Sequence, residues 1–330
     1  MAALAAVVLP WCATGQSQDF KVGRHLKIGG TGGWDYIAQH PQTRDLYVSH
    51  GTQVNIISSA TGDSVGCIPN TTGVHGIAFV AEQGKGYTSN GQLNTVAVFD
   101  MRTNAVKGQV KTGENPDAIM YDAFSHLLYV CNGRSKDMSI IDPVHDSVVA
   151  VVPLGGKPET AVSDNKGHIY VNVEDKNEIV VWNTQSRTIT NRWPTGHGEE
   201  PAGLAIDRAG KRLFAGCSKL LVVMSTDDGK VIAELPIGDG CDGVGYDEGL
   251  HLAFCSNGSG TLSVAGMRSG TYSILATVPT QRGARTLVVD DVLHKIYLPV
   301  AAYGALPPNS ERRRPPIVPG TFEVLEVSRQ

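Results

Sequence analysis

Charged residues are scarce in this chain, and neither sign of charge dominates. Asp, Glu, Lys and Arg make up only 18% of the 330 residues, and the formal net charge is −4. Proteins that bind nucleic acid usually carry a basic groove with aromatic side chains on which bases stack. No such groove is visible in the sequence, so we do not expect a nucleic acid as partner.

The signature motifs of several enzyme classes are also missing. The sequence contains no Walker loop, no G-x-S-x-G, no H-E-x-x-H and no EF-hand loop. Its six Cys residues, at positions 12, 67, 131, 217, 241 and 255, include no C-x-x-C pair. This spacing excludes a zinc signature and a disulfide framework. Helical periodicity is absent beyond residue 20, which points to an all-β chain.

The N-terminal residues have the character of a secretory signal. An apolar run over residues 2–9 is followed by the small residues Ala13, Thr14 and Gly15, although no Lys or Arg precedes the run. The run is far shorter than the ~20 residues that a membrane span needs. We expect a signal peptide over residues 1–17, export to the periplasm or the medium, and one domain over residues 18–330. A disordered cytosolic tail is the alternative.

A strand-like unit occurs seven times along the chain. Each copy begins with a short apolar run, passes through a polar turn that often holds Asp, and reaches a second strand centred on an aromatic residue. The second residues of the copies stand at 35, 75, 117, 159, 202, 242 and 285, so the period is 40 to 43 residues. Such a period of β-strand sequence is typical of propeller blades. The opening runs are Trp34–Ala38, Val74–Ala78, Pro116–Met120, Pro158–Val162, Pro201–Ala205, Cys241–Gly245 and Ala284–Val288.

The two ends of the chain complete each other. The seventh copy has first, second and third strands near 284–289, 295–298 and 321–327, and then the chain stops. Residues 23–30 match the pattern of the fourth strand at 107–113. We therefore predict a seven-bladed β-propeller of four-stranded antiparallel blades, in which the N-terminal strand closes the last blade and removes an open edge. We expect a monomer.

Five segments at the starts and ends of strands show a further likeness: Leu46–Gly51, Gly113–Ala118, Leu128–Gly133, Gly155–Glu159 and Pro279–Arg285. On these residues the repeat resembles that of YVTN-type propellers, and the chain as a whole is similar to bacterial YncE-family proteins. The resemblance spans all seven blades and implies an exported propeller, but it implies little about chemistry because one fold hosts many functions. DNA binding, associated with a YncE-like relative, is a remote alternative.

Propeller geometry brings the start of each first strand and the end of each second strand to one face, at the mouth of the central channel. Glu159 lies 11 positions before Tyr170, whereas Asp117 lies 12 before Tyr129, so a register slip is most expected in the fourth blade. The strand starts predict an inner ring of Asp35, His75, Asp117, Glu159, Asp242 and Arg285. The strand ends predict an outer ring of His50, Asn90, Asn132 and Asn257, and Glu200 and Arg282 precede their strands.

Several interpretations of this polar mouth stay open. The candidates for a divalent cation are His75, Asp117 and Glu159, since mixed O and N ligands suit such an ion. Arg282 and Arg285 could clamp a carboxylate or phosphate, or merely neutralise the acidic ring. The Asn-Gly pairs at 90–91, 132–133 and 257–258 also suit tight turns that need a positive φ.

The function we predict is binding of a small ligand, an ion or a protein at this mouth, without established catalysis. A lactonase-like hydrolase or lyase that uses the His, carboxylate and Arg side chains is the alternative. A Pro-rich insertion with three Arg, residues 301–320, emerges on the same face and is either a cover or a surface excursion.

Overall fold

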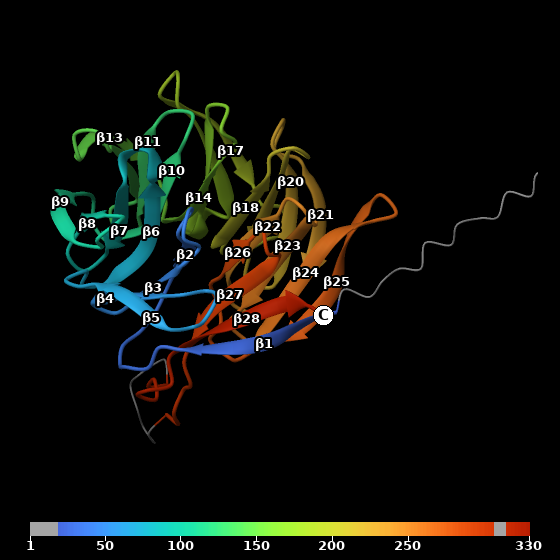
Figure 1. The fold of residues 1–330 in the computed structure, drawn as a ribbon. Helices are drawn as coiled ribbons and strands as arrows, with labels where there is room; N and C mark the ends of the chain where they lie inside the picture. Colours follow the sequence, from blue (N-terminus) through green and yellow to red (C-terminus); the bar gives the residue numbers. More distant parts are fainter. Residues whose placement is uncertain (1–18, 307–314) are drawn as a thin grey trace, which may run out of the picture.

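The computed structural model describes residues 19–306 and 315–330. These residues form seven four-stranded antiparallel sheets. Figure 1 shows the sheets arranged as blades around a central axis. The predicted seven-bladed β-propeller is confirmed. The expected signal peptide and residues 307–314 of the insertion lie outside the described residues.

The blades follow one another along the chain, and each runs from the channel outward. Blade 1 contains β2 (Ile37–Gln39), β3 (Leu46–His50), β4 (Gln53–Ile57) and β5 (Ser64–Ile68). Blade 2 contains β6 (Val74–Val80), β7 (Lys85–Asn90), β8 (Thr95–Asp100) and β9 (Val106–Lys111), with the 3-10 helix η1 (Ala81–Gln83) between β6 and β7. Blade 3 contains β10 (Pro116–Asp122), β11 (Leu127–Asn132), β12 (Asp137–Asp142) and β13 (Ser147–Pro153).

The remaining blades repeat the arrangement. Blade 4 contains β14 (Pro158–Ser163), β15 (His168–Val173), β16 (Glu178–Asn183) and β17 (Thr188–Pro194), with η2 (Glu174–Lys176) after β15. Blade 5 contains β18 (Gly203–Asp207), β19 (Arg212–Gly216), β20 (Leu220–Ser225) and β21 (Val231–Pro236). Blade 6 contains β22 (Cys241–Asp247), β23 (Leu252–Asn257), β24 (Thr261–Arg268) and β25 (Thr271–Pro279). Blade 7 contains β26 (Val288–Asp290), β27 (Lys295–Val300), β28 (Glu323–Arg329) and β1 (Phe20–Lys27).

Blade 7 is assembled from both ends of the chain, as predicted. Strand β1 pairs antiparallel with β28 from Phe20↔Arg329 to Lys27↔Glu323, and Figure 1 shows the blue β1 beside the red β28. The strand lies three residues nearer the N-terminus than the predicted 23–30. Leu26 is buried, and the ring of Phe20 packs edge-on against Phe254 of blade 6 at 5.2 Å. The closing strand therefore also joins two blades.

The hydrophobic core lies between neighbouring blades. The aromatic residue at the centre of each second strand is no more than 3% exposed, because its side chain stands on the face that meets the next sheet. These residues are Tyr47, Tyr87, Tyr129, Tyr170, Phe214, Phe254 and Tyr297. No helix among the described residues is long and apolar enough to span a membrane.

The Asp residues of the first polar turn join blades on the face opposite the mouth. Asp247, which is fully buried, is bonded to Nδ1 of His294 in the next blade at 2.8 Å. Tyr246 donates its hydroxyl to Asp207 of the preceding blade at 2.9 Å. Asp290 is paired in the same way with Arg44 of blade 1. The Asp residues that mark these turns in the sequence therefore also connect neighbouring blades.

Candidate functional site

A shift in strand pairing turns the first residues of the inner strands toward the channel. In blades 2, 3, 4 and 6 the register changes just after the first residue of the inner strand. Such a bulge re-aims the side chain that follows it. The slip expected in blade 4 does not occur: Val162 pairs with Tyr170 as Met120 pairs with Tyr129, each three residues past the ring position. The missing residue is absorbed by the turn instead.

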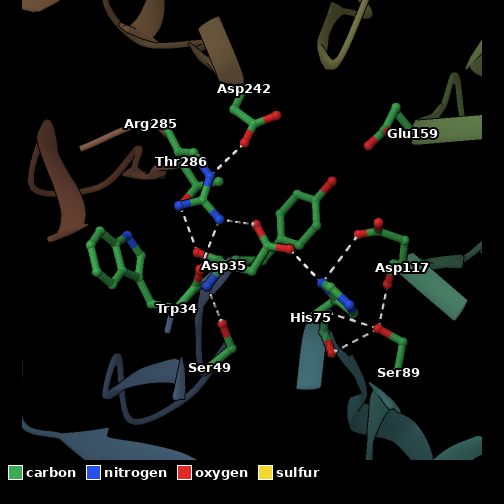
Figure 2. Close-up of polar contacts among 12 residues, drawn as sticks. Trp34, Asp35, Ser49, His75, Ser89, Asp117, Glu159, Asp242, Arg285 and Thr286 are labelled. Carbon is green, nitrogen blue, oxygen red and sulfur yellow. Dashed lines mark hydrogen bonds and ion pairs between the residues drawn. The ribbon is translucent and has the colours of Figure 1, made fainter. Parts of the chain in front are cut away.

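Five blades contribute to a continuous chain of alternating charges around the mouth. Arg285 donates from Nε to Asp242 at 2.7 Å and from a terminal nitrogen to Asp35 at 3.2 Å. The other oxygen of Asp35 lies 2.5 Å from Nδ1 of His75, which lies 3.7 Å from Asp117. Figure 2 shows these side chains pointing toward one another. Arg285 therefore bonds to carboxylates of the two neighbouring blades.

Glu159 and Ala202 interrupt this chain. The Glu159 carboxylate is bonded to Lys157 of its own blade, and Lys157 also contacts Glu174. In Figure 2 Glu159 stands apart from the other carboxylates. Blade 5 offers only the methyl group of Ala202 at the ring position. Lys157 was missed by sequence reasoning, although its place two residues before Glu159 was visible.

Small polar residues hold the backbone of the ring, and sequence reasoning missed them too. Ser89, one residue before the end of its strand, bonds to the carbonyl of Asp117 in the next blade. Ser256 donates to the carbonyl of Arg285 at 2.5 Å, and Asn172 donates to that of Ala202 at 3.0 Å. Each bond crosses from one blade to the next. The ring is therefore held in place by its main chain as well as by its charges.

Tyr36 lies across the channel beneath the ring. Its hydroxyl lies 3.4 Å from Oγ1 of Thr160, so the side chain reaches from blade 1 to blade 4. Burial and the charges of Asp117 and Asp35 raise its pKa well above the usual value. The other six blades have small residues at this position, and that contrast was the signal that could have identified Tyr36. These residues are Gly76, Ala118, Thr160, Gly203, Gly243 and Thr286.

The surroundings in the ring raise the pKa values of four of its members. Burial alone would lower the pKa of His75, but its hydrogen bond to Asp35 and the charges of Asp117, Asp35 and Glu159 raise it to about 9. Burial, together with neighbouring carboxylates, raises the pKa values of Asp117 and Glu159. Burial also raises the pKa of Asp242, although Arg285 opposes that effect. The mouth therefore holds protons that free side chains would have lost.

Three donor groups of the ring are close enough to share a cation. Ligand atoms of Asp35, His75 and Asp117 all lie within 4.8 Å of one another. The sequence-based candidates were His75, Asp117 and Glu159, and Asp35 takes the place of Glu159 because Lys157 holds that carboxylate. Arg285 already contacts Asp35, so a second positive charge would compete with it.

The predicted outer ring lies inside the blades. Asn90, Asn132 and Asn257 have no exposed surface, and His50 packs on Phe322 with its ring centre 4.3 Å away. Asn132 donates to Asp137 at 2.7 Å and Asn257 donates to Thr261 at 3.0 Å, each within its own blade. These side chains organise the hairpins and offer a ligand no surface.

The turn interpretation of the Asn-Gly pairs needs correction. Gly91, Gly133 and Gly258 do not have positive φ; the left-handed residues are Asn94, Lys136 and Gly260 further along the same turns. Gly91 is required for space, because a Cβ there would lie 2.7 Å from Nε2 of His75.

A polar pocket of about 420 Å³ opens at the mouth over blades 4 to 7. Its lining includes the carboxylates of Glu174, Glu200 and Asp242, the guanidinium groups of Arg282 and Arg285, and Tyr303 from the insertion. The bridge Tyr303↔Ile317 folds the described part of the insertion back on itself. Tyr303 packs on Trp34 at 6.0 Å and above Gly283, where a Cβ would lie 2.6 Å from the tyrosine ring. The insertion thus forms one wall of the pocket.

Comparison with solved structures gives the class of the protein. A chain from the Kuenenia stuttgartiensis hydrazine synthase has a TM-score of 0.72 at 15% identity, and the match covers 84% of this chain and 94% of that chain. The U3-55K structure has a TM-score of 0.78 at 10% identity, covering 92% of this chain and 98% of that one. The RRP9 WD40 repeats have a TM-score of 0.79 at 10% identity, covering 95% and 98%.

Likeness at such low identity extends to the fold alone. No family model matches the chain, and no curated protein matches its sequence. Fold and site together define a seven-bladed β-propeller with a polar pocket at the mouth of a channel that Tyr36 crosses.

Proposed function

We propose that this protein is an exported propeller of the YVTN-repeat type that binds a small polar ligand in the pocket at its mouth. The observation that carries the proposal is the convergence of three carboxylates, two guanidinium groups and a tyrosine on one concavity of about 420 Å³. A concave pocket with a few convergent polar groups is the usual form of a ligand site. That volume suits a small molecule better than a folded protein partner.

A ligand screen by thermal shift tests the proposal. The panel contains amino acids, dicarboxylates, sugars, inorganic phosphate and divalent metal ions. We expect at least one compound to raise the melting temperature, and we expect Arg282→Ala and Tyr303→Ala to abolish that rise. Arg268→Ala is the matched control, because Arg268 is exposed at the end of β24, and β24 does not contribute to the pocket. If every stabilising compound acts equally on the pocket variants and on wild type, the site lies elsewhere.

A metal-assisted hydrolase is the second candidate function, and one observation favours it. Asp35, His75 and Asp117 present mixed oxygen and nitrogen donors at mutual distances that one divalent cation could span. A histidine with a pKa of about 9 is mostly protonated at neutral pH, which disfavours it as a general base there. A cation would have to displace that proton.

Calorimetric titration with Mn²⁺ and Zn²⁺ tests this candidate. We expect any binding at the triad to strengthen between about pH 7 and about pH 9, as His75 releases its proton. Asp117→Asn should abolish it, whereas Glu159→Gln should matter less because Glu159 is held by Lys157. Binding that is insensitive to both pH and Asp117 would exclude the triad.

Export is proposed on the apolar run over residues 2–9 and the small residues that follow it. N-terminal sequencing of protein recovered from the periplasm or medium should give a first residue near position 18. Recovery of intact Met1 only in the cytosol would contradict export.

A further inference from the structure

In most blades, the residue two places before the ring position has a demanding backbone conformation. In five blades it has a positive φ: Gly73 (71°), Asn115 (55°), Glu200 (52°), Gly240 (70°) and Gly283 (97°). Glycine adopts this region without cost and asparagine tolerates it, whereas other side chains pay about 1–2 kcal/mol. Long side chains adopt it elsewhere in this protein, such as Lys136 in a hairpin turn. Four of these five positions hold Gly or Asn, and only Glu200 has a long side chain.

Asn115 and Glu200 occupy equivalent positions in their blades and share two backbone features. Each precedes a proline and a ring residue, and each donates its backbone N–H to an asparagine Oδ1 at 2.9 Å. These acceptors are Asn94 for Asn115 and Asn177 for Glu200. The backbone of blade 5 therefore does not need a glutamate. A strained residue that persists at a pocket suggests that its side chain is used there.

The carboxylate of Glu200 stands in the pocket without a cation beside it. Its one side-chain contact in the described part of the chain is Ser218, which donates Oγ–H to Oε2 at 2.7 Å. The other two carboxylates of the pocket are neutralised, Glu174 by Lys157 and Asp242 by Arg285. Glu200 is thus the acidic group that remains for a ligand.

Arg282 is the corresponding group of opposite sign. Its side chain makes no hydrogen bond or ion pair with any residue in 19–306 or 315–330, and it is exposed in the pocket. Arg285, by contrast, is occupied by Asp35, Asp242 and the carbonyl of Trp34. Arg282 comes from the approach to blade 7 and Glu200 from the approach to blade 5, with blade 6 between them. The two do not pair with each other.

We propose that the pocket binds a small zwitterion, an amino acid or a dipeptide, with its ammonium group on Glu200 and its carboxylate on Arg282. This inference rests on the proposed function and names the ligand class. An ammonium group would form a charge-assisted hydrogen bond with Glu200, and the guanidinium fork suits a carboxylate. Backbone hydrogen bonds run from Ser218, the partner of Glu200, through Gly240 and Gly258 of blade 6 to Gly283, the neighbour of Arg282. The residues of blade 6 in this row are glycines and bring no side chain into the pocket.

Calorimetry with the common L-amino acids, 4-aminobutyrate and Gly-Gly tests the proposal on the full-length protein. We expect at least one of them to bind more tightly than about 1 mM. For that compound, the N-acetyl form, which lacks the cation, and the amide form, which lacks the anion, should each bind more than about tenfold more weakly. Binding of Gly-Gly alone would indicate a dipeptide ligand, and binding of an L-amino acid would indicate a free amino acid.

Glu200→Gly separates a ligand-binding role from a structural one. Because glycine suits this backbone, the variant should melt at or above the wild-type temperature and yet lose more than about tenfold in affinity. Glu200→Gln should lose a similar amount of affinity. Arg282→Gln should not weaken binding of the amide form further, because that form lacks the carboxylate that Arg282 would bind. Asn115→Gly is the matched control, with the same backbone change outside the pocket and unchanged binding.

Two results would overturn the inference. One is that no zwitterion of the panel binds at about 10 mM. The other is that Glu200→Gly binds the zwitterion like wild type. If a sugar or a dicarboxylate binds instead, and depends on Arg282 but not on Glu200, the ligand class is wrong while the proposed function of the pocket stands.

Discussion

At the scale of single residues, the mouth is an arrangement in which almost every charge has a neighbour. His75 lies between Asp35 and Asp117, and Arg285 lies between Asp242 and the same Asp35. Buried charges are tolerated only when they are paired in this way. The pocket beside the ring differs, because Glu200 and Arg282 have no ion-pair partner among the described residues and stay available to a ligand.

The stabilising effect of His75 should disappear as the pH rises. Its pKa is raised from 6.5 to about 9 by contacts with Asp35 and Asp117. A group whose pKa is raised on folding stabilises fully below its unfolded pKa, and that contribution is lost as the pH rises through the folded pKa. We expect the stability advantage of wild type over His75→Gln to shrink by roughly 2–3 kcal/mol between about pH 6.5 and about pH 10.

Urea unfolding of both proteins at several pH values measures this change. A proton NMR titration of His75 should give a midpoint near the folded pKa, and Asp35→Asn should lower it. A wild-type midpoint near 6.5 would show that the ion pair does not hold the proton.

Which residues reach the mouth was largely predictable, but what they do there was not. Ring membership follows from strand register, and register is visible in the repeat; even Glu159 keeps its place because a shorter turn absorbs the missing residue. Glu159 is paired with Lys157. The repeat pattern does not show which way the Lys157 side chain turns, so this pairing could not be predicted. The outer ring was misjudged because Asn132 and its equivalents satisfy their own hairpins.

At the scale of strands and turns, the polar turn after each inner strand joins the blades. Four turn Asp residues accept hydrogen bonds from their own turn and from the following blade, namely Asp122, Asp207, Asp247 and Asp290. Asp290 accepts from the backbone of Leu293 at 2.7 Å and from Gln39 of blade 1 at 2.8 Å, and it pairs with Arg44. One carboxylate therefore closes a turn and the junction between blades 7 and 1.

Removing that carboxylate should destabilise the propeller strongly. Asp290→Ala leaves Arg44, Gln39 and a turn N–H without their acceptor, and we expect a loss of about 3–5 kcal/mol. Asp290→Asn keeps an acceptor for the turn and should lose less. Asp291→Ala, at the exposed neighbouring position, should stay within about 0.5 kcal/mol of wild type. Chemical denaturation measures all three, and equal stability of Asp290→Ala and Asp291→Ala would contradict a joining role.

At the scale of the whole molecule, the pairing of β1 with β28 converts a row of blades into a ring. A linear repeat array can lose an end without affecting distant repeats. In a closed ring each blade contacts two neighbours, so opening blade 7 exposes faces on both sides of the break. Leu26 is 3% exposed in β1 and packs in the cluster that joins blades 6, 7 and 1.

A lesion in β1 should therefore lower the stability of blades that it does not contact. We expect Leu26→Ala to cost about 2–4 kcal/mol. The loss should be the same whether unfolding is followed by Trp34, at the junction of blades 1 and 7, or by Trp182 in blade 4. Each reporter is isolated by replacing the other tryptophans with Phe. Lys21→Ala, on the exposed side of β1, is the control and should leave both curves unchanged.

The shape of the two unfolding curves decides between a ring and a row. If β1 closes the fold thermodynamically, the Trp34 and Trp182 transitions coincide in wild type and move together in Leu26→Ala, because the blades unfold as one unit. If β1 only caps the edge of blade 7, Leu26→Ala should destabilise blade 7 without affecting the other blades. The Trp34 signal would then change at lower denaturant while the Trp182 midpoint stayed at its wild-type value.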